Sequence, residues 1–197
     1  MIIWLNGTFG SGKTSTAERL AALVPDSRVI DPETVGQLLR VNLSDQYMSD
    51  FQDWPAWRPI VAATIVEIAR MTGQHIIAPQ TVLKRDYLDQ IFAPMRAAEL
   101  EVFHVVLDAA DDLLRSRIEI SGEGREWRLA HLDEYTAARP WMTEAADFVV
   151  DTTASTPAQI ARRIVGAMPS MPDLPAPPKV AAKPSANGKT AQKAQAE

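Results

Sequence analysis

A loop near the start of the chain has the residue types needed to hold phosphate. Residues 7–14 read GTFGSGKT, between an apolar run at 2–5 and an amphipathic stretch at 16–24. Glycines let the backbone curl around phosphate oxygens, and the following helix directs free N–H groups and its positive dipole end at them. Lys13 then reaches the β- and γ-phosphates, and the Thr14 hydroxyl suits Mg²⁺. The sequence therefore predicts an ATP and Mg²⁺ site formed by Gly7, Thr8, Phe9, Gly10, Ser11, Gly12, Lys13, Thr14 and Ser15.

The alternative for this loop is a glycine-rich turn that caps an ordinary helix. The order of strand, loop and helix around the motif favours phosphate binding over that alternative.

Composition limits the class of protein. The 197 residues, 46% of them hydrophobic, suffice for one core. The absence of cysteine excludes disulfides and suits a reducing cytosol, and no apolar run approaches the ~20 residues of a membrane span. We therefore expect a cytoplasmic protein, or one peripheral to the membrane. The net charge of −5 argues against a nucleic-acid partner. The histidines have no ligand-like spacing and predict no metal site.

The fold is predicted from five apolar runs, at residues 2–5, 28–30, 75–78, 101–107 and 147–150, that alternate with helical patterns. Nearly continuous Val, Ile and Leu indicates strands buried on both faces, and crossover helices between them indicate a parallel sheet. We predict an α/β fold of the P-loop NTPase type: a five-stranded parallel sheet with flanking helices and a lid, as in nucleoside and small-molecule kinases. This domain covers residues 1–168. Residues 169–197, rich in Pro, Ala and Lys, are expected to be a disordered tail.

Ligands of such sheets bind at the carboxyl ends of the strands. After the second run, Asp31 could accept a proton from a substrate hydroxyl. The alternative is a helix cap, because Asp followed by Pro is a standard helix start. After the third run Gln80 stands where many P-loop enzymes have an acid. We predict that Gln80 contacts substrate, and that Mg²⁺ depends on Thr14, phosphates, water and Asp31.

The block FQDWPAWR at residues 51–58 crowds aromatic side chains, an acid and a base around a proline. Trp54 and Trp57 could form a wall against which a planar ring stacks, with Asp53 and Arg58 orienting polar groups of the substrate. The alternative is that both tryptophans anchor a helix start in the core.

Arginines follow the fourth run, on a helical segment at 111–117 and a Gly-flanked segment at 121–128. Such an arrangement is typical of a lid whose guanidinium groups offset charge on the transferring phosphoryl group. We assign Arg117 and Arg125 to catalysis, and Arg117 and Arg128 to nucleotide binding. Arg115, four residues after Asp111, could serve only the helix surface.

Taken together, several segments resemble the tunicamycin-resistance ATP-binding protein family: IIWLNGTFGSGKT, DPE, FQDWPAWR, APQTV, and LLRSRI with the downstream Trp127. The resemblance runs from residue 1 to about 165. It implies a P-loop kinase-like fold, ATP binding and ATP-dependent phosphorylation of a nucleoside-type antibiotic. It also implies phosphate and Mg²⁺ contacts for Lys13 and Thr14, with Asp31, Asp53, Trp57 and Arg58 on the substrate side. The family has been associated with membranes through an amphipathic C-terminal segment, whereas this tail is rich in Pro, Ala and Lys, so the resemblance does not carry membrane attachment over to this chain.

The sequence thus predicts an ATP-dependent phosphotransferase that acts on a hydroxyl of a nucleoside-type antibiotic and confers resistance. Two alternatives share its features: a housekeeping nucleoside or metabolite kinase, and a protein that sequesters drug and ATP without chemistry. A regulatory GTPase is disfavoured, because no Asn-Lys-x-Asp motif occurs. Nothing in the sequence indicates the oligomeric state.

Overall fold

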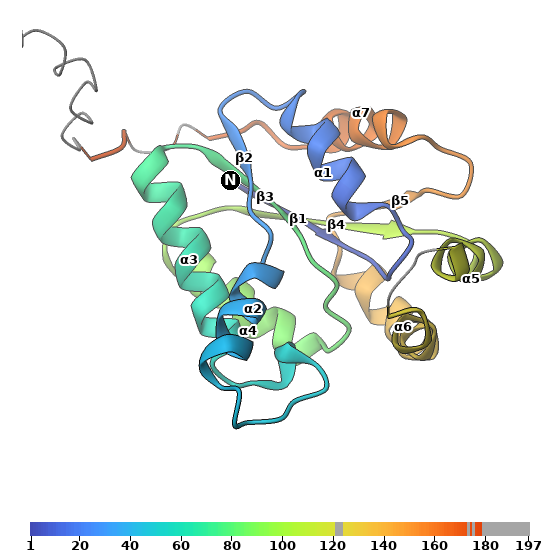
Figure 1. Ribbon diagram of the computed structural model, residues 1–197. Coiled ribbons are helices and arrows are strands. Elements are labelled where there is room, and N and C mark those ends of the chain that lie inside the picture. The colour runs from blue at the N-terminus through green and yellow to red at the C-terminus, as the bar shows by residue number, and fades with distance from the viewer. Residues whose placement is uncertain (121–123, 173, 175, 179–197) are drawn as a thin grey trace, which may run out of the picture.

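The computed structural model describes residues 1–120, 124–172, 174 and 176–178. Within them lies one sheet of five parallel strands in the order β2-β3-β1-β4-β5 (Figure 1). The strands are β1 (Ile2–Asn6), β2 (Ser27–Val29), β3 (His75–Pro79), β4 (Val102–Asp108) and β5 (Phe148–Asp151). The predicted five-stranded parallel sheet is confirmed.

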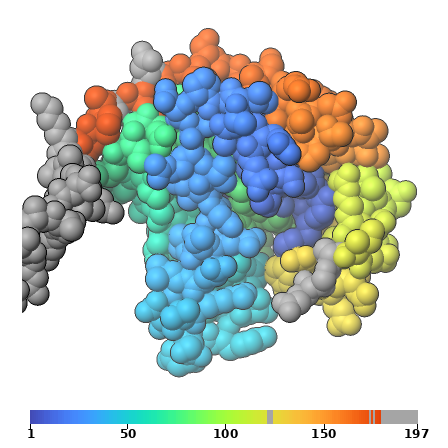
Figure 2. All heavy atoms as spheres, turned by 45° about the horizontal axis from the view of Figure 1, so that its top comes forward, coloured from blue at the N-terminus to red at the C-terminus, as the bar shows by residue number. Residues whose placement is uncertain are grey.

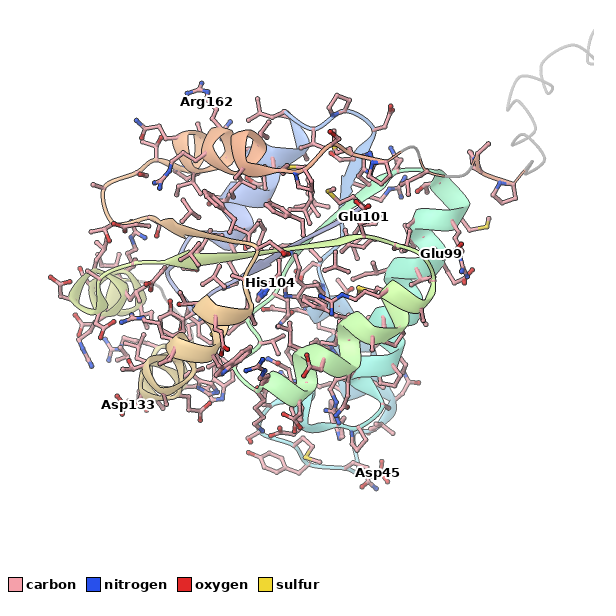
Figure 3. The ribbon with its side chains drawn as sticks, turned by 180° about the vertical axis from the view of Figure 1, so that it is seen from behind. Asp45, Glu99, Glu101, His104, Asp133 and Arg162 are labelled. Carbon is pink, nitrogen blue, oxygen red and sulfur yellow. The ribbon has the colours of Figure 1, made fainter. Side chains whose placement is uncertain are left out.

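Helices cover both faces of the sheet (Figure 1). α1 (Lys13–Ala21) and α7 (Pro157–Ala167) pack together on one face, and α3 (Trp57–Thr72) and α4 (Arg85–Ala97) pack together on the other. The remaining elements stand near the carboxyl ends of the strands; they are α2 (Glu33–Asn42), the short 3₁₀ helix η1 (Phe51–Asp53), α5 (Asp111–Ile120) and α6 (Arg125–Ala145). From behind, Asp133 and Arg162 point outward from α6 and α7, while His104 lies inside (Figure 3).

Strand β1 shows why a continuous apolar run becomes a central strand. All of its residues are buried. Because successive side chains alternate between faces, Ile2 and Trp4 join the core under α3 and α4, whereas Ile3 and Leu5 join the core under α1 and α7. Burying such a side chain contributes roughly 1.5–3 kcal/mol relative to exposure. The strand that carries the phosphate loop is therefore fixed from both sides.

After α7, Leu174 packs against the core cluster of α3 and α4. Contact with the folded part therefore continues beyond residue 168, where we expected the tail to begin. Most of the predicted disordered tail, residues 179–197, lies outside the described residues. Within the described part, no helix combines the length and the apolar composition needed to cross a membrane.

Candidate active site

The loop between β1 and α1 has the geometry of a phosphate cradle. Gly10 and Gly12 adopt left-handed conformations, with φ of 78° and 92°. Gly12 is the N-cap residue of α1 and provides no side-chain cap, and the first turn of α1 holds no acid. Since the first N–H groups of a helix have no acceptor within it, they are left for an anion. Thr14 and Ser15 are exposed at this helix start.

Lys13 folds back over the loop. Its Nζ donates hydrogen bonds to the carbonyl oxygens of Gly7, at 3.1 Å, and Thr8, at 3.0 Å. Burial lowers the pKa of Lys13 to about 8, and the nearby carboxylate of Glu33 only partly opposes this shift. A phosphate bound beside Lys13 would raise its pKa again, because an opposite charge favours the protonated amine.

Two side chains that the sequence did not single out hold the loop in register. Asn6 Oδ1 accepts from the amides of Gly7, at 2.8 Å, and Val82, at 2.9 Å, while its Nδ2 donates to the Val82 carbonyl at 3.1 Å. Thr81 Oγ1 donates to the Gly7 carbonyl at 2.8 Å. Asn6 directly precedes the glycine motif, but its partner Val82 is 76 residues away, so no local pattern reveals the link between the two loops.

Gln80 was expected to contact substrate. It is 2% exposed, its Nε2 donates to the Thr81 carbonyl at 3.1 Å, and it lines neither of the pockets described below. The side chain is turned into the loop after β3, and its contact with substrate stays a prediction.

Two carboxylates stand just after β2. Asp31 is exposed and its Oδ1 accepts the backbone amide of Glu33 at 2.9 Å, so its capping role is visible. Its role as a base remains a prediction. Burial raises the pKa of Glu33, and Asp31 adds to this, whereas Lys13 and Arg128 oppose it. Glu33 thus interacts with cations of both the phosphate loop and α6, although the sequence analysis left it unassigned.

The two tryptophans of the 51–58 block lie in the core. Trp57 is fully buried, its Nε1 donates to the Pro32 carbonyl at 3.3 Å, and its ring packs against Phe51 at 5.2 Å between centroids. Trp54 is 6% exposed. Neither ring offers a broad free face in this conformation, and stacking of either ring on a ligand stays a prediction. The alternative of core anchors agrees with their burial.

Arg58 of this block is also buried, and its side chain contacts other residues of the protein. Its Nε donates to Gln90 Oε1 at 2.6 Å, its guanidinium lies 4.0 Å from the centroid of the Tyr87 ring, and it bonds the Gln52 carbonyl. It supports the segment before α3, and it lines neither of the pockets described next.

Asp53, in contrast, faces a pocket. Its Oδ1 accepts from Lys84 Nζ at 2.6 Å and from the Tyr87 hydroxyl at 2.8 Å. Although burial acts to raise it, these hydrogen bonds lower the pKa of Asp53.

A cavity of about 450 Å³ opens here, lined by Ser49, Asp50, Asp53, Leu83, Lys84, Trp127, His131, Glu134, Ala137, Ala138 and Trp141. A smaller pocket shares seven of these residues and adds four others, Phe9 of the phosphate loop, Gln52, Thr81 and Tyr87. We call the two together the acceptor pocket. Figure 2 shows the segment around residues 30–55, in light blue and cyan, as a mass separate from α5, in yellow-green, and α6, in yellow, with residues of the dark blue N-terminal segment between them.

The three predicted arginines are placed differently. Arg117 Nη1 donates to the Gly10 carbonyl at 2.9 Å, so α5 brings it to the phosphate loop. Arg128 lies with its guanidinium 5.8 Å from the centroid of the Phe9 ring. Arg125, the first residue of α6, is exposed. Residues 121–123 of the expected lid lie outside the described part.

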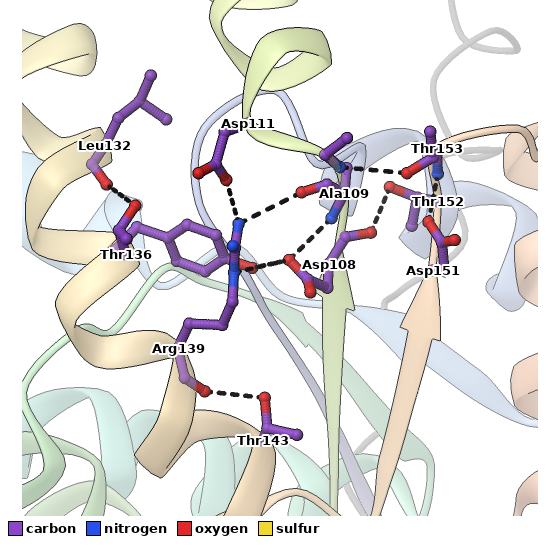
Figure 4. Close-up of polar contacts among 12 residues, drawn as sticks. Asp108, Ala109, Asp111, Leu132, Thr136, Arg139, Thr143, Asp151, Thr152 and Thr153 are labelled. Carbon is purple, nitrogen blue, oxygen red and sulfur yellow. Dashed lines mark hydrogen bonds and ion pairs between the residues drawn. The ribbon is translucent and has the colours of Figure 1, made fainter.

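A polar network at the end of β4 fixes α6 beside the phosphate loop (Figure 4). Asp108 Oδ1 accepts from the Tyr135 hydroxyl at 2.5 Å and pairs with Arg139 Nε at 3.2 Å. Arg139 also pairs with Asp111 at the start of α5. Burial raises the pKa of Tyr135, and Asp108 adds to this, so the phenol stays protonated and donates. Sequence reasoning missed the network because its partners come from separate elements.

Comparisons with known proteins agree with this geometry. Residues 2–139 match the family described as the AAA domain. The chain belongs to the AAA domain family. Among curated proteins, no match to this AAA domain protein was found. It is similar to the structure of the tunicamycin resistance protein of Deinococcus radiodurans, with a TM-score of 0.68 and 25% identity over 84% of this chain and 93% of that one. The resemblance inferred from the sequence is confirmed.

Two further structures share the fold of this AAA domain protein. One is a gluconokinase from Sinorhizobium meliloti, with a TM-score of 0.60 and 20% identity over 84% of this chain and 89% of that one. The other is the Mycobacterium tuberculosis APS kinase in complex with AMPPNP and APS, with a TM-score of 0.54 and 16% identity over 84% and 95%. The fold is therefore that of P-loop kinases.

Proposed function

We propose that this protein is an ATP-dependent phosphotransferase that transfers the γ-phosphoryl group to a hydroxyl of a nucleoside-type antibiotic. The observation that carries the proposal is the place of Phe9. This residue belongs to the phosphate loop and also lines the acceptor pocket, so the two half-sites adjoin. The similarity to a protein named for tunicamycin resistance supports an antibiotic as the acceptor.

The nucleotide half-site consists of residues 7–15, with Lys13 beside the β- and γ-phosphates. Arg117, held at the Gly10 carbonyl, is close enough to the loop to contact phosphate. Arg125 and Arg128 remain proposed nucleotide contacts. Losing one such cation at the transferring group would cost about 3–5 kcal/mol of barrier, or roughly 10²- to 10⁴-fold in rate.

Magnesium fits the start of α1 in a limited way. Within the described residues, no three His, Asp or Glu side chains converge to hold a metal. The exposed Thr14 hydroxyl, phosphate oxygens and water suit Mg²⁺, which keeps several waters when it binds phosphates. When bound there, the ion neutralises charge that develops on the β- and γ-oxygens.

On the acceptor side, a carboxylate after β2 would take the hydroxyl proton. Asp31 is our candidate from the sequence, and Glu33 is the second, because it interacts with Lys13 and is partly desolvated. Asp53 with Lys84 would orient polar groups of the acceptor. Trp54, Trp57, Arg58 and Gln80 would act only by supporting the segments around the pocket.

Mass spectrometry of tunicamycin incubated with the full chain and Mg-ATP tests the proposal. We expect a phosphorylated drug, and no product with Lys13→Ala. A drug that binds in the presence of ATP but gains no phosphate refutes the transferase and favours sequestration.

The matched pair Asp31→Asn and Glu33→Gln identifies the base. Asn keeps the cap acceptor at position 31, so the variant with a kcat lower by about 10²-fold or more has lost the proton acceptor. Near-normal turnover in both variants would exclude a carboxylate base after β2.

A further inference from the structure

α6 provides an aromatic surface in the acceptor pocket. The sequence predicted such a surface from the 51–58 block. Trp127 is 38% exposed although its indole contacts two other rings. It lies 3.9 Å from His131 and 5.1 Å from Phe9, measured between ring centroids. His131 Nδ1 lies 2.7 Å from the Trp127 carbonyl, which holds the imidazole against the indole. All three rings line the smaller part of the pocket.

Carboxylate side chains outnumber lysine and arginine side chains in the acceptor pocket. Its carboxylates are Asp50, Asp53 and Glu134, and its lysine, Lys84, is already paired with Asp53 at 2.6 Å. Glu134 lies 4.0 Å from His131. Among the residues that line this cavity, no other lysine or arginine is present to offset Asp50 and Glu134.

Asp50 is the acid of this group most removed from water. Its Oδ1 accepts the Gln52 amide at 2.9 Å. Burial raises the pKa of Asp50, the Gln52 amide opposes this, and the neighbouring Asp53 adds to it. A ligand N–H or O–H that donates a hydrogen bond to this carboxylate offsets the free energy lost when the protein removed water from it. A ligand phosphate or carboxylate would instead meet the like charge of a half-buried carboxylate.

We propose that the acceptor pocket selects an uncharged acceptor with a planar ring, which stacks on Trp127 and donates a hydrogen bond to Asp50. Aromatic surface at a ligand site favours planar rings, and like-charge opposition discriminates against a competing ligand that carries an anion. Acceptors that already carry a phosphate group therefore bind more weakly. This inference deepens the proposed function, on which its relevance to phosphoryl transfer rests, but selectivity of binding is measured separately from transfer.

The test measures binding of uridine, cytidine and adenosine, and of their 5′-monophosphates, to the full chain. AMPPNP is kept saturating, so that the phosphate loop is occupied and a monophosphate competes only for the acceptor pocket. Quenching of tryptophan fluorescence serves as the readout, with calorimetry as a second measurement. We expect at least one nucleoside to bind about tenfold or more tightly than its monophosphate at low salt.

Variants assign the selectivity to residues. Trp127→Ala should weaken nucleoside binding by about tenfold, and Trp127→Phe should reduce the quenching, with Trp141 as the other tryptophan of the pocket, while calorimetry still detects binding. Asp50→Asn should reduce the preference for the nucleoside over the monophosphate by about tenfold. Asp45→Asn is the matched control: it removes an equal charge from the same segment but outside the acceptor pocket (Figure 3), and should leave the preference unchanged.

Equal affinity for nucleosides and monophosphates, or nucleoside binding unaffected by Trp127→Ala, would overturn the inference, as would an absence of binding by all three nucleosides. The two proposals fail separately. Selective binding without phosphorylated tunicamycin retains the pocket and removes the transferase, whereas phosphorylated tunicamycin without selectivity retains the transferase and removes the pocket.

Discussion

Lys13 gives the sharpest prediction, because burial lowers its pKa to about 8 in the free protein. At pH 9 about nine-tenths of these side chains are therefore neutral, at pH 8 about half, and at pH 7 about one-tenth. A bound triphosphate favours the charged form and should return the pKa to above ~10. Nucleotide binding should then take up about 0.8–0.9 proton at pH 9 and about 0.1 at pH 7.

The direction of this pKa shift also determines how the stability of the protein depends on pH. Because folding disfavours the protonated amine, Lys13 lowers the free energy of unfolding at pH values below 8. This cost disappears as the pH rises from 8 toward 10.5. Added nucleotide should relieve this cost at neutral pH, because a bound phosphate favours the charged amine.

Calorimetric titration of AMPPNP in two buffers of different ionisation enthalpy measures the uptake directly. At pH 9 the free nucleotide is fully deprotonated, so protons taken up belong to the protein. In Lys13→Arg the guanidinium stays charged, and the uptake should fall to near zero wherever binding is still measurable. Strong binding at pH 9 without proton uptake in the wild-type protein would refute the assigned environment of Lys13.

Three further outcomes are expected. Gly7→Ala should destabilise the protein far more than Gly12→Ala, because a Cβ at Gly7 meets a β4 carbonyl oxygen at 2.5 Å whereas a Cβ at Gly12 meets no atom within 4 Å. At Gly12 only the left-handed backbone is strained, by roughly 1–2 kcal/mol. Equal losses of unfolding free energy in urea denaturation would contradict this prediction. Asn6→Ala should lower the unfolding free energy by about 2–3 kcal/mol, since it leaves buried amides of the loop without acceptors, and should weaken AMPPNP binding; intact affinity would show that the loop holds its register otherwise. Tyr135→Phe should cost about 1–2 kcal/mol of unfolding free energy, because it removes the hydrogen bond to Asp108, and an unchanged urea midpoint would show that this bond contributes nothing net.

The sheet and the phosphate loop were predictable because their signals are local. A strand buried on both faces must be continuously apolar, and the loop concentrates its functional groups in nine residues. The sequence left two roles open for Trp54 and Trp57, and the reason is physical. An aromatic residue beside a proline suits a pocket wall and a helix anchor equally, and only the packing of α3 against the core decides between them.

The acceptor pocket was only partly accessible to sequence reasoning for the opposite reason. Asp50, Lys84, His131 and Glu134 come from three segments whose approach depends on the crossovers of the sheet. Each of these residues looks like an ordinary surface position in its own segment. Asp53 was found because it belongs to a dense local block, whereas Trp127 entered only through a family resemblance.

The double position of Phe9 has a consequence for how the two ligands influence one another. The ring is part of the phosphate loop and contacts Trp127 in the acceptor pocket. Any movement of the loop when nucleotide binds therefore changes the surface offered to the second ligand. Thermodynamic reciprocity then requires each ligand to change the affinity for the other by the same factor. If nucleotide shifts the loop, the contact of these two rings is the place where nucleotide occupancy is passed to the acceptor pocket.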